Sequence, residues 1–406
     1  IELPFPPNSG STLASEAPAG VVIEGFHNPE VATAAWRATS LGADAFRAPL
    51  VILQADPVEF LIGCSRCADL AILADPRCRV FLGPTATADL RAFLHARLDT
   101  TLPKHFLRVP GLVTPADPAP EVVLRAAHDA QQTEHAALTA HLNSRPRRDW
   151  SQRFGAAIAG VDVPLRILIP TTRYSTYVCH AAADLAAALR ELGHDAMTLE
   201  EPADDARLSS VAYLRAARDF TPDLIVSINY TRAQLRGALP ADVPFVCWVQ
   251  DRMPHLFDRV LGAAHGPLDF LAGHIHPSLY LDFGYPRRRT MFRAVPASPR
   301  TFHAASPSPA HACHVLYAGH QSESPDTLRD RLLPSFAQIP GLVDAARDID
   351  ARLRTLAETG SLTAAALDTL TRAALAARNI PLTNPRAVET FDATFTRALA
   401  ERIHRH

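Results

Sequence analysis

The chain has 406 residues, of which 48% are hydrophobic and 20% are charged, and its formal net charge is −2. These values are ordinary for a folded protein and exclude a disordered chain. A net charge near zero gives no positive field to attract phosphate backbones, so we expect no nucleic-acid partner. No apolar run reaches about 18 residues, and no basic leader opens the chain, which predicts a cytoplasmic location without integral membrane contact.

Six cysteines over this length do not form the dense pattern of a disulfide framework, and we expect free thiols. Cys64, Cys67 and Cys78 offer three zinc ligands, but no fourth ligand lies nearby in the sequence. Asp348 and Asp350 match an Asp-x-Asp metal signature, but they lie in a helical run, where residues two apart face different ways. We therefore predict no metal site.

Breaker residues and apolar runs divide the first part of the chain. Residues 1–20 are rich in proline, which predicts an irregular arm. Apolar runs at 49–53 and 78–82 alternate with helical stretches and predict a small α/β module over residues 21–112. Residues 113–160 then combine a proline-rich linker with one long bridging helix.

Residues 161–303 carry the clearest pattern, because short continuous apolar strands alternate there with helices. This alternation is typical of a parallel sheet covered on both faces, and it predicts a Rossmann-like domain. Residues 304–406 begin with a linker rich in serine and proline and one strand, and then continue as helices. The predicted class is therefore α/β, with Rossmann-like parallel sheets in two modules and a mostly helical C-terminal region. In residues 161–303 we expect strands at 165–170, 196–199, 223–228, 244–249 and 269–273, and helices at 181–192, 210–219 and 233–239.

The carboxyl ends of parallel strands are where such sheets bind ligands, which selects candidate residues by position. The loop after the first strand of this domain is rich in hydroxyl groups that would bind a sugar or a phosphate. A plain loop with Ser175 or Thr176 as a helix cap explains the same residues equally well. The loop lacks the Gly-x-Gly-x-x-Gly fingerprint, and we expect no dinucleotide cofactor. Its candidate substrate-binding residues are Thr171, Thr172, Arg173, Tyr174 and Ser175.

Two further loops follow the strands at 223–228 and 244–249. In the first, Asn229 and Tyr230 would orient a polyol, although turn chemistry alone also explains an asparagine there. The second loop contains Asp251 and His255, either of which would take a proton from an acceptor hydroxyl. The alternative for Asp251 is a cap on the next helix. The neighbouring Gln250 and Arg252 complete the predicted substrate-binding set.

Four stretches of this domain resemble the acceptor-side half of GT-B glycosyltransferases, in particular the CgeB-like bacterial group. They are Leu165–Pro170, Ala188–Asp195, Pro222–Ile225 and Pro244–Asp251. The resemblance implies metal-independent transfer of a sugar from a nucleotide-sugar donor to an acceptor, which is a glycan, a protein or a small molecule.

The same resemblance extends into the next segment of the chain. Residues 293–302 look like the crossover linker of that fold, and 315–319 look like the first strand and glycine turn of its donor domain. The donor-binding residues implied are Gly319, His320, Gln321 and Ser322.

The sequence departs from the family after Gly319, because roughly 85 mostly helical residues remain, too few for an ordinary Rossmann domain. The chain begins at Ile1 rather than at a methionine, and we expect either a chain cut short before its donor domain is complete or a degenerate relative. A hexosyltransferase-type glycosyltransferase is the leading interpretation. The alternative is a non-catalytic carbohydrate- or nucleotide-binding protein, or a scaffold in envelope or appendage modification.

Overall fold

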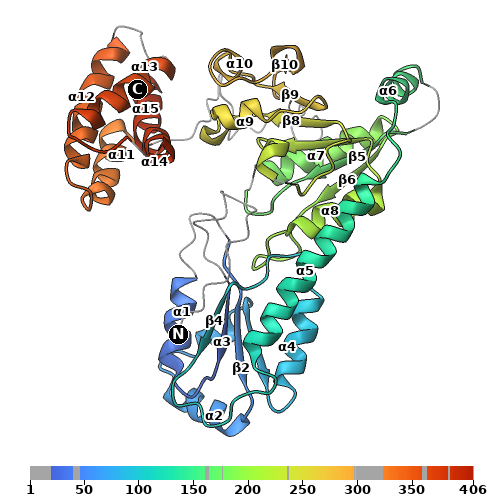
Figure 1. The fold of residues 1–406 in the computed structure, drawn as a ribbon, viewed down its shortest axis with the longest axis vertical. Helices are drawn as coiled ribbons and strands as arrows, with labels where there is room; N and C mark the ends of the chain where they lie inside the picture. Colours follow the sequence, from blue (N-terminus) through green and yellow to red (C-terminus); the bar gives the residue numbers. More distant parts are fainter. Residues whose placement is uncertain are drawn as a thin grey trace, which may run out of the picture. The chain divides into compact units, whose positions relative to one another are not determined.

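A computed structural model describes residues 20–39, 46–160, 164–175, 177–235, 237–296, 298, 323–358, 364–382 and 385–405 (Figure 1). The chain divides into two compact units. Unit 1 contains both sheets, and the helical C-terminal region belongs to unit 2. The predicted class, α/β with two parallel sheets and a helical C-terminal region, is confirmed.

The N-terminal sheet has four parallel strands in the order β3-β2-β1-β4. The apolar runs at 49–53 and 78–82 predicted two of these strands, within one residue of their observed bounds. The other two were missed because each has only four residues, and the fourth strand contains only two apolar side chains. The strands are β1 (Val21–Glu24), β2 (Leu50–Gln54), β3 (Cys78–Leu82) and β4 (His105–Arg108).

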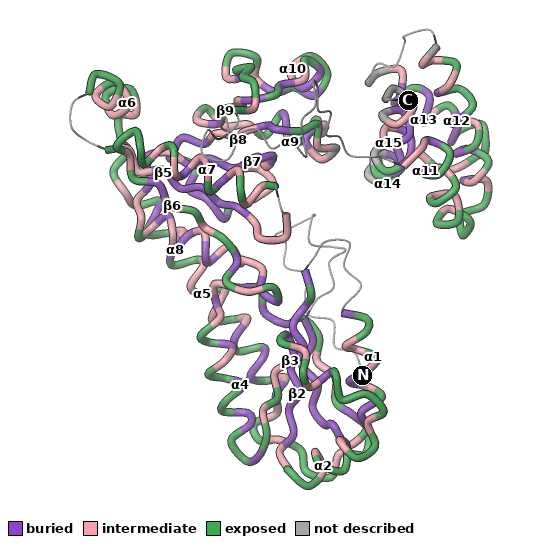
Figure 2. Tube along the Cα trace, turned by 180° about the vertical axis from the view of Figure 1, so that it is seen from behind, coloured by how far each residue is buried: buried purple, intermediate pink, exposed green. Residues whose placement is uncertain are grey.

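Helices cover both faces of this sheet, so its central strands are buried throughout (Figure 2). Side chains of Asn28 and Asp56 accept from backbone N–H groups in the first turns of the helices that follow them, and each of these helices begins with a proline. One face packs against α1 (Pro29–Ala38), α2 (Pro57–Arg66) and α3 (Ala71–Ala74), and the other against α4 (Ala86–His95) and α5 (Pro120–Asn143).

The β1–α1 connection approaches α2 so closely that only glycine fits at residue 63. A Cβ atom added there would lie 1.9 Å from the carbonyl oxygen of Phe26. The Phe26 ring is fully buried, and its centroid lies 5.2 Å from that of Phe60. The β1–α1 connection and α2 are therefore packed directly against each other.

The second sheet has six parallel strands in the order β10-β9-β8-β7-β5-β6. All five strands predicted for this region are present, within one residue at each end. The sixth, at the edge, has only three residues and was missed. The strands are β5 (Arg166–Pro170), β6 (Asp195–Leu199), β7 (Leu224–Ile228), β8 (Phe245–Val249), β9 (Asp269–Gly273) and β10 (Thr290–Phe292).

Two of the three helices predicted in this domain are confirmed as α7 (Val178–Glu191) and α8 (Ser210–Phe220). The helix expected at 233–239 was wrong. Only a single 3-10 turn forms, at Arg232–Leu235, because Gly237 has a φ of +71° and Pro240 follows. Shorter elements not predicted are α6 (Trp150–Ile158), α9 (Arg259–Ala263), α10 (Ser278–Leu281) and 3-10 turns at Pro254–Leu256 and Arg287–Arg289.

The long helix α5 belongs to both cores of unit 1. Near its start, Val123, Leu124 and Ala127 pack against the N-terminal sheet and α4. Near its end, Leu138 and Leu142 pack against α8. The predicted bridging helix is therefore a shared part of two hydrophobic cores.

In unit 2, every described residue from 325 to 336 and most from 342 onward lie in helices. Their apolar faces form one core that includes Phe391, Phe395 and Leu399. The helices are α11 (Pro325–Leu332), a 3-10 turn (Leu333–Phe336), α12 (Leu342–Glu358), α13 (Ala364–Ala376), α14 (Pro385–Phe391), a π-helical turn (Asp392–Arg397) and α15 (Ala398–Arg405).

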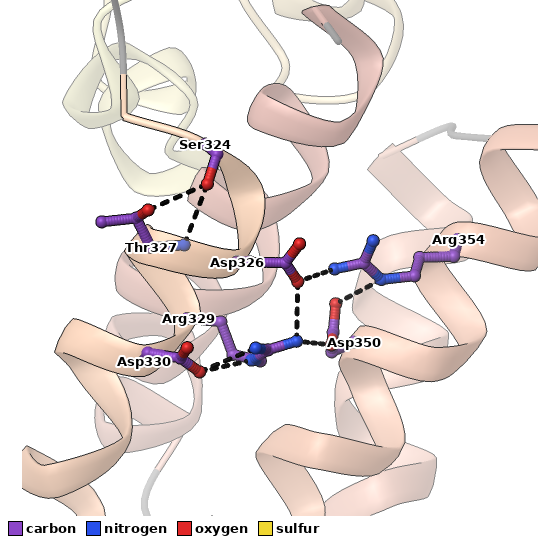
Figure 3. Close-up of polar contacts among 7 residues, drawn as sticks. All are labelled: Ser324, Asp326, Thr327, Arg329, Asp330, Asp350 and Arg354. Atoms are coloured by element: carbon purple, nitrogen blue, oxygen red, sulfur yellow. Dashed lines mark hydrogen bonds and ion pairs between the residues drawn. The ribbon is translucent and has the colours of Figure 1, made fainter.

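Ion pairs between α11 and α12 account for the Asp-x-Asp match (Figure 3). Asp350 accepts from Arg329 at 3.1 Å and from Arg354 at 3.1 Å. Asp348 instead pairs with Arg352, one turn along the same helix. The two carboxylates thus have separate arginine partners.

The close contact at residue 63 predicts opposite effects of one substitution in two helices. Gly63→Ala should lower the free energy of unfolding by about 1–3 kcal/mol, because the added methyl group overlaps the Phe26 carbonyl. Gly155→Ala in α6 should raise it by up to about 1 kcal/mol, because nothing lies within 4 Å and alanine favours the helix. Urea unfolding of the two variants measures both changes. Equal effects at the two positions would contradict the close packing of α2 on the β1–α1 connection.

Candidate functional site

The strand order fixes where a ligand site belongs in the six-stranded sheet. From β5 the chain passes to β6 on one side and then returns to β7 on the other side. Connections that leave in opposite directions open a crevice at the carboxyl ends of the two central strands. The loops after β5 and β7 border this position, and both were predicted as ligand-binding loops.

The first of these loops is held by hydrogen bonds to the chain itself. Ser175 Oγ accepts from the backbone N–H of Val178 at 3.3 Å. Thr171 is buried, and its hydroxyl donates to the carbonyl of Val178 at 3.4 Å. The helix α7 has Tyr177 at its N-cap position and no side-chain cap bond, so Ser175 contacts its first residue without being its N-cap. Thr176, the other predicted cap, lies outside the described residues.

The rest of this loop contacts Glu201, a buried carboxylate just after β6. Glu201 accepts from the Thr172 hydroxyl at 3.2 Å and from the backbone N–H of Arg173 at 2.9 Å. Arg173 also pairs with Asp204 at 3.0 Å, and the Tyr174 hydroxyl donates to backbone carbonyls of residues 203–206. These polar groups therefore bind the next loop of the protein rather than facing an open site.

Glu201 was missed from the sequence, although a carboxylate directly after a strand end was the available signal. Burial raises the pKa of Glu201 above its ordinary value, while the hydrogen bonds from Arg173 and Thr172 lower it. Nearby, burial and then the charges of Glu201 and Tyr230 raise the pKa of Tyr213 to about 12.

Asn229 joins the ends of β7 and β8. It is buried and has a φ of +58°, a left-handed conformation that asparagine tolerates better than most residues. Its Oδ1 atom accepts from the backbone N–H groups of Gln250 at 2.8 Å and Asp251 at 3.3 Å. Its Nδ2 atom donates to Asp251 Oδ2 at 3.3 Å. One side chain therefore positions both predicted residues that follow β8.

The His255 ring is fixed by the same strand end. His255 Nε2 lies 2.7 Å from the carbonyl oxygen of Asn229, and its ring stacks on Tyr230 with the centroids 4.7 Å apart. A carbonyl can only accept, so the proton is on Nε2 and the lone pair of Nδ1 can accept one. Burial lowers the pKa of His255 below 6.5, despite the bond to Asn229, which acts in the opposite direction. The ring is therefore a neutral base at pH 7.

Asp251 and Arg252 are exposed at this edge. The Asp251 carboxylate accepts a hydrogen bond from Asn229. Within the described residues, this carboxylate makes no capping bond to the turn at Pro254–Leu256. The alternative reading of Asp251 as a helix cap thus has no support in its contacts. Burial, followed by the charge of Asp251, raises the pKa of Tyr177 above its ordinary value.

Gln250 differs from its neighbours because its amide group is buried without a hydrogen-bond partner among the described residues. The residue is 6% exposed. In the described part of the chain, neither Nε2 nor Oε1 has a hydrogen-bond partner. Most buried polar groups in proteins are paired, so an unpaired amide at a strand end requires an explanation.

The predicted residues therefore separate into two sets. Asn229, Tyr230, Gln250, Asp251 and His255 gather around the ends of β7 and β8. Residues 172–174 instead contact the loop after β6. The donor-binding residues Gly319, His320, Gln321 and Ser322, and the strand expected at 313–318, lie outside the described residues.

Other features of the chain do not add ligands to this site. A groove of about 470 Å³ lies beside β6 and is lined by Met197, Leu199 and Phe220, among others, but by none of the predicted residues. In the described ranges, no three His, Cys, Asp or Glu side chains are grouped to hold a metal ion. No described helix has both the length and the apolar character needed to cross a membrane.

Comparisons of the chain with protein-family models, with curated proteins and with solved structures find no match. The resemblance to GT-B glycosyltransferases thus stays a prediction.

The environment of His255 predicts its tautomer and its titration. At pH 7 the ring should carry its proton on Nε2 and should titrate below pH 6.5, because burial disfavours the charged form. Its folded-state pKa is below the unfolded value, so wild type should lose stability relative to His255→Gln as the pH falls below about 6.5. Long-range ¹H–¹⁵N NMR and urea unfolding between pH 5 and 8 measure both effects, with the urea-unfolded chain as reference. Protonation of Nδ1 at pH 7 would contradict the assigned tautomer.

Proposed function

We propose that this protein transfers a sugar from a nucleotide-sugar donor to a hydroxyl group of an acceptor bound at the ends of β7 and β8. The observation that carries the proposal is the neutral His255 ring, whose Nε2 is committed to the Asn229 carbonyl and whose Nδ1 can accept a proton. A hydroxyl is a weak nucleophile at neutral pH, so its transfer chemistry needs such a base. The resemblance to the acceptor side of GT-B enzymes supports the same assignment.

In the proposed step, the acceptor hydroxyl gives its proton to His255 Nδ1 as its oxygen attacks the anomeric carbon of the donor. The bond between that carbon and the nucleoside diphosphate breaks, and the diphosphate leaves with the electron pair. Stacking on Tyr230 and the bond to Asn229 hold the ring in a single orientation during the transfer. His255 then returns the proton to solvent. No metal ion takes part.

Asp251 and Arg252 have secondary roles in this proposal. The Asp251 carboxylate, fixed by Asn229, accepts a hydrogen bond from a second hydroxyl of the acceptor. Arg252 is exposed and has no partner in the described residues, so its charge is available to the leaving diphosphate. The donor residues implied by the resemblance are 319–322, and the proposal assigns them no geometry.

A second candidate function is binding without turnover, as a carbohydrate- or nucleotide-binding protein or a scaffold. Its support is the C-terminal region: from residue 323 on, the described ranges form helices with their own core and contain no strand. A GT-B donor domain would contribute a further parallel sheet. A non-catalytic protein would bind an acceptor at the same strand ends and release it unchanged.

The test is donor consumption by the full chain in the presence of a panel of glycosyl acceptors, with variants of the candidate base. His255→Ala should reduce the rate by about 10²-fold or more, the usual contribution of a general base. Asp251→Ala should have a smaller effect, because this residue only orients the acceptor. His105→Ala is the matched control, since His105 is exposed on the N-terminal sheet and should leave the rate unchanged.

An Asp251→Ala, His255→Ala double variant that folds and retains the full rate would remove both residues from the mechanism. A wild-type chain that binds an acceptor in calorimetric titration but consumes none of the nucleotide sugars would favour the non-catalytic candidate instead.

A further inference from the structure

The unpaired side chain of Gln250 points to a ligand contact that neither the mechanism nor the family resemblance assigns. Both polar atoms of its amide are buried, and in the described part of the chain neither has a partner. An amide that is not needed by the fold destabilises the free protein, because it has lost its hydrogen bonds to water. A methionine would fill nearly the same volume without that penalty.

The backbone of Gln250 is held in place. The N–H of Gln250 is bonded to Asn229 Oδ1, and the carbonyl of Val249 accepts from the backbone N–H of His274 at 2.7 Å. The preceding strand, β8, is paired on both edges, with β7 and β9. The point from which the Gln250 side chain extends is therefore fixed by the sheet and by Asn229.

The alternation along β8 shows which side of the sheet the amide faces. Val246 and Trp248 pack against the core cluster that includes Val226 and Ile228 of β7, and Gln250 is two residues further along the same face. Gln250 therefore lies at the carboxyl end of β8, next to Asn229, whose Oδ1 accepts from its backbone N–H.

We propose that Gln250 is a specificity residue that recognises two adjacent hydroxyl groups of a sugar-like acceptor. One hydroxyl donates to Oε1, and its neighbour accepts from Nε2, so a single amide satisfies a vicinal diol. The amide carries no charge, which favours neutral groups over a phosphate. This inference rests on the proposed function, since it uses the same strand ends and the same base.

Asn229 links recognition to catalysis in this arrangement. Its side chain holds the backbone of Gln250, and its carbonyl oxygen holds His255. A diol bound by Gln250 is thus located relative to the base through one residue. Because the amide atoms are covered in the free protein, binding requires the atoms that cover them to move aside.

Gln250→Met tests the assignment because it should change stability and binding in opposite directions. Its thermal unfolding midpoint should rise by a few degrees, since the unpaired amide is removed. Its affinity for methyl glucoside, galactoside or mannoside, whichever binds wild type best, should fall at least tenfold in NMR titration. A deoxy analogue lacking one hydroxyl of the recognised diol should bind wild type and variant equally weakly.

The matched control is Gln131→Met in α5, whose Nε2 donates to the carbonyls of Leu98 at 2.7 Å and Thr100 at 2.8 Å. That variant should unfold at a lower temperature and bind the glycoside normally. Gln250→Glu is a second variant that keeps an acceptor and loses the donor, and it should also weaken binding.

Three results would overturn the proposal. A Gln250→Met variant that misfolds, or unfolds as early as Gln131→Met, would show that the amide is bonded in the free protein, for example to a buried water. Unchanged glycoside affinity would remove it from the site. A wild-type chain that binds none of the methyl glycosides would reject the diol. A failure of the proposed function would be seen in a different measurement. That proposal is tested by the transfer rate of His255→Ala, whereas diol recognition is tested by the glycoside affinity and the stability of the Gln250 variants.

Discussion

The hydrogen bonds of Asn229 determine where every other residue of the candidate site lies. Its side chain spans from the end of β7 to the backbone of Gln250 and Asp251, and its own carbonyl receives His255. The left-handed backbone at φ +58° is what turns the amide toward β8. Few residue types combine a tolerance for that conformation with a donor and an acceptor, so the strand end depends on asparagine.

This interaction also explains why the chemistry is centred on β7 and β8 rather than on the loop after β5. The β5 loop has more hydroxyl groups, but it contacts Glu201, Asp204 and the start of α7, so those groups are already paired. At β7 and β8, Asn229 positions Gln250 through its backbone N–H and His255 through its ring Nε2. The Gln250 amide is covered in the free protein but has no hydrogen-bond partner among the described residues, and His255 Nδ1 can accept a proton.

Much of the fold could be predicted because parallel strands buried on both faces are continuous apolar runs. The strands at 244–249 and 269–273 are clear cases. The four-residue strand His105–Arg108 could not be predicted. It is a strand because it pairs with β1, and its own residues show no strand pattern. In the candidate site, we could predict Asn229, Asp251 and His255 because each follows the end of a predicted strand. The sequence could not show which hydroxyl groups of the β5 loop form hydrogen bonds within the protein. Their partner Glu201 is distant in the chain, and its contacts depend on the β5–β6 pairing.

The helix α5 contributes to two hydrophobic cores, and this affects how the chain folds during synthesis. The N-terminal core is incomplete until residues up to Ala127 have left the ribosome, because that stretch covers one face of the first sheet. Once this half is helical, the rest of the helix extends from an existing end, which avoids a second nucleation step. Leu138 and Leu142 are then already arrayed when α8 emerges. Because one helix contributes to both cores, packing of the first core stabilises the helix that the second core needs.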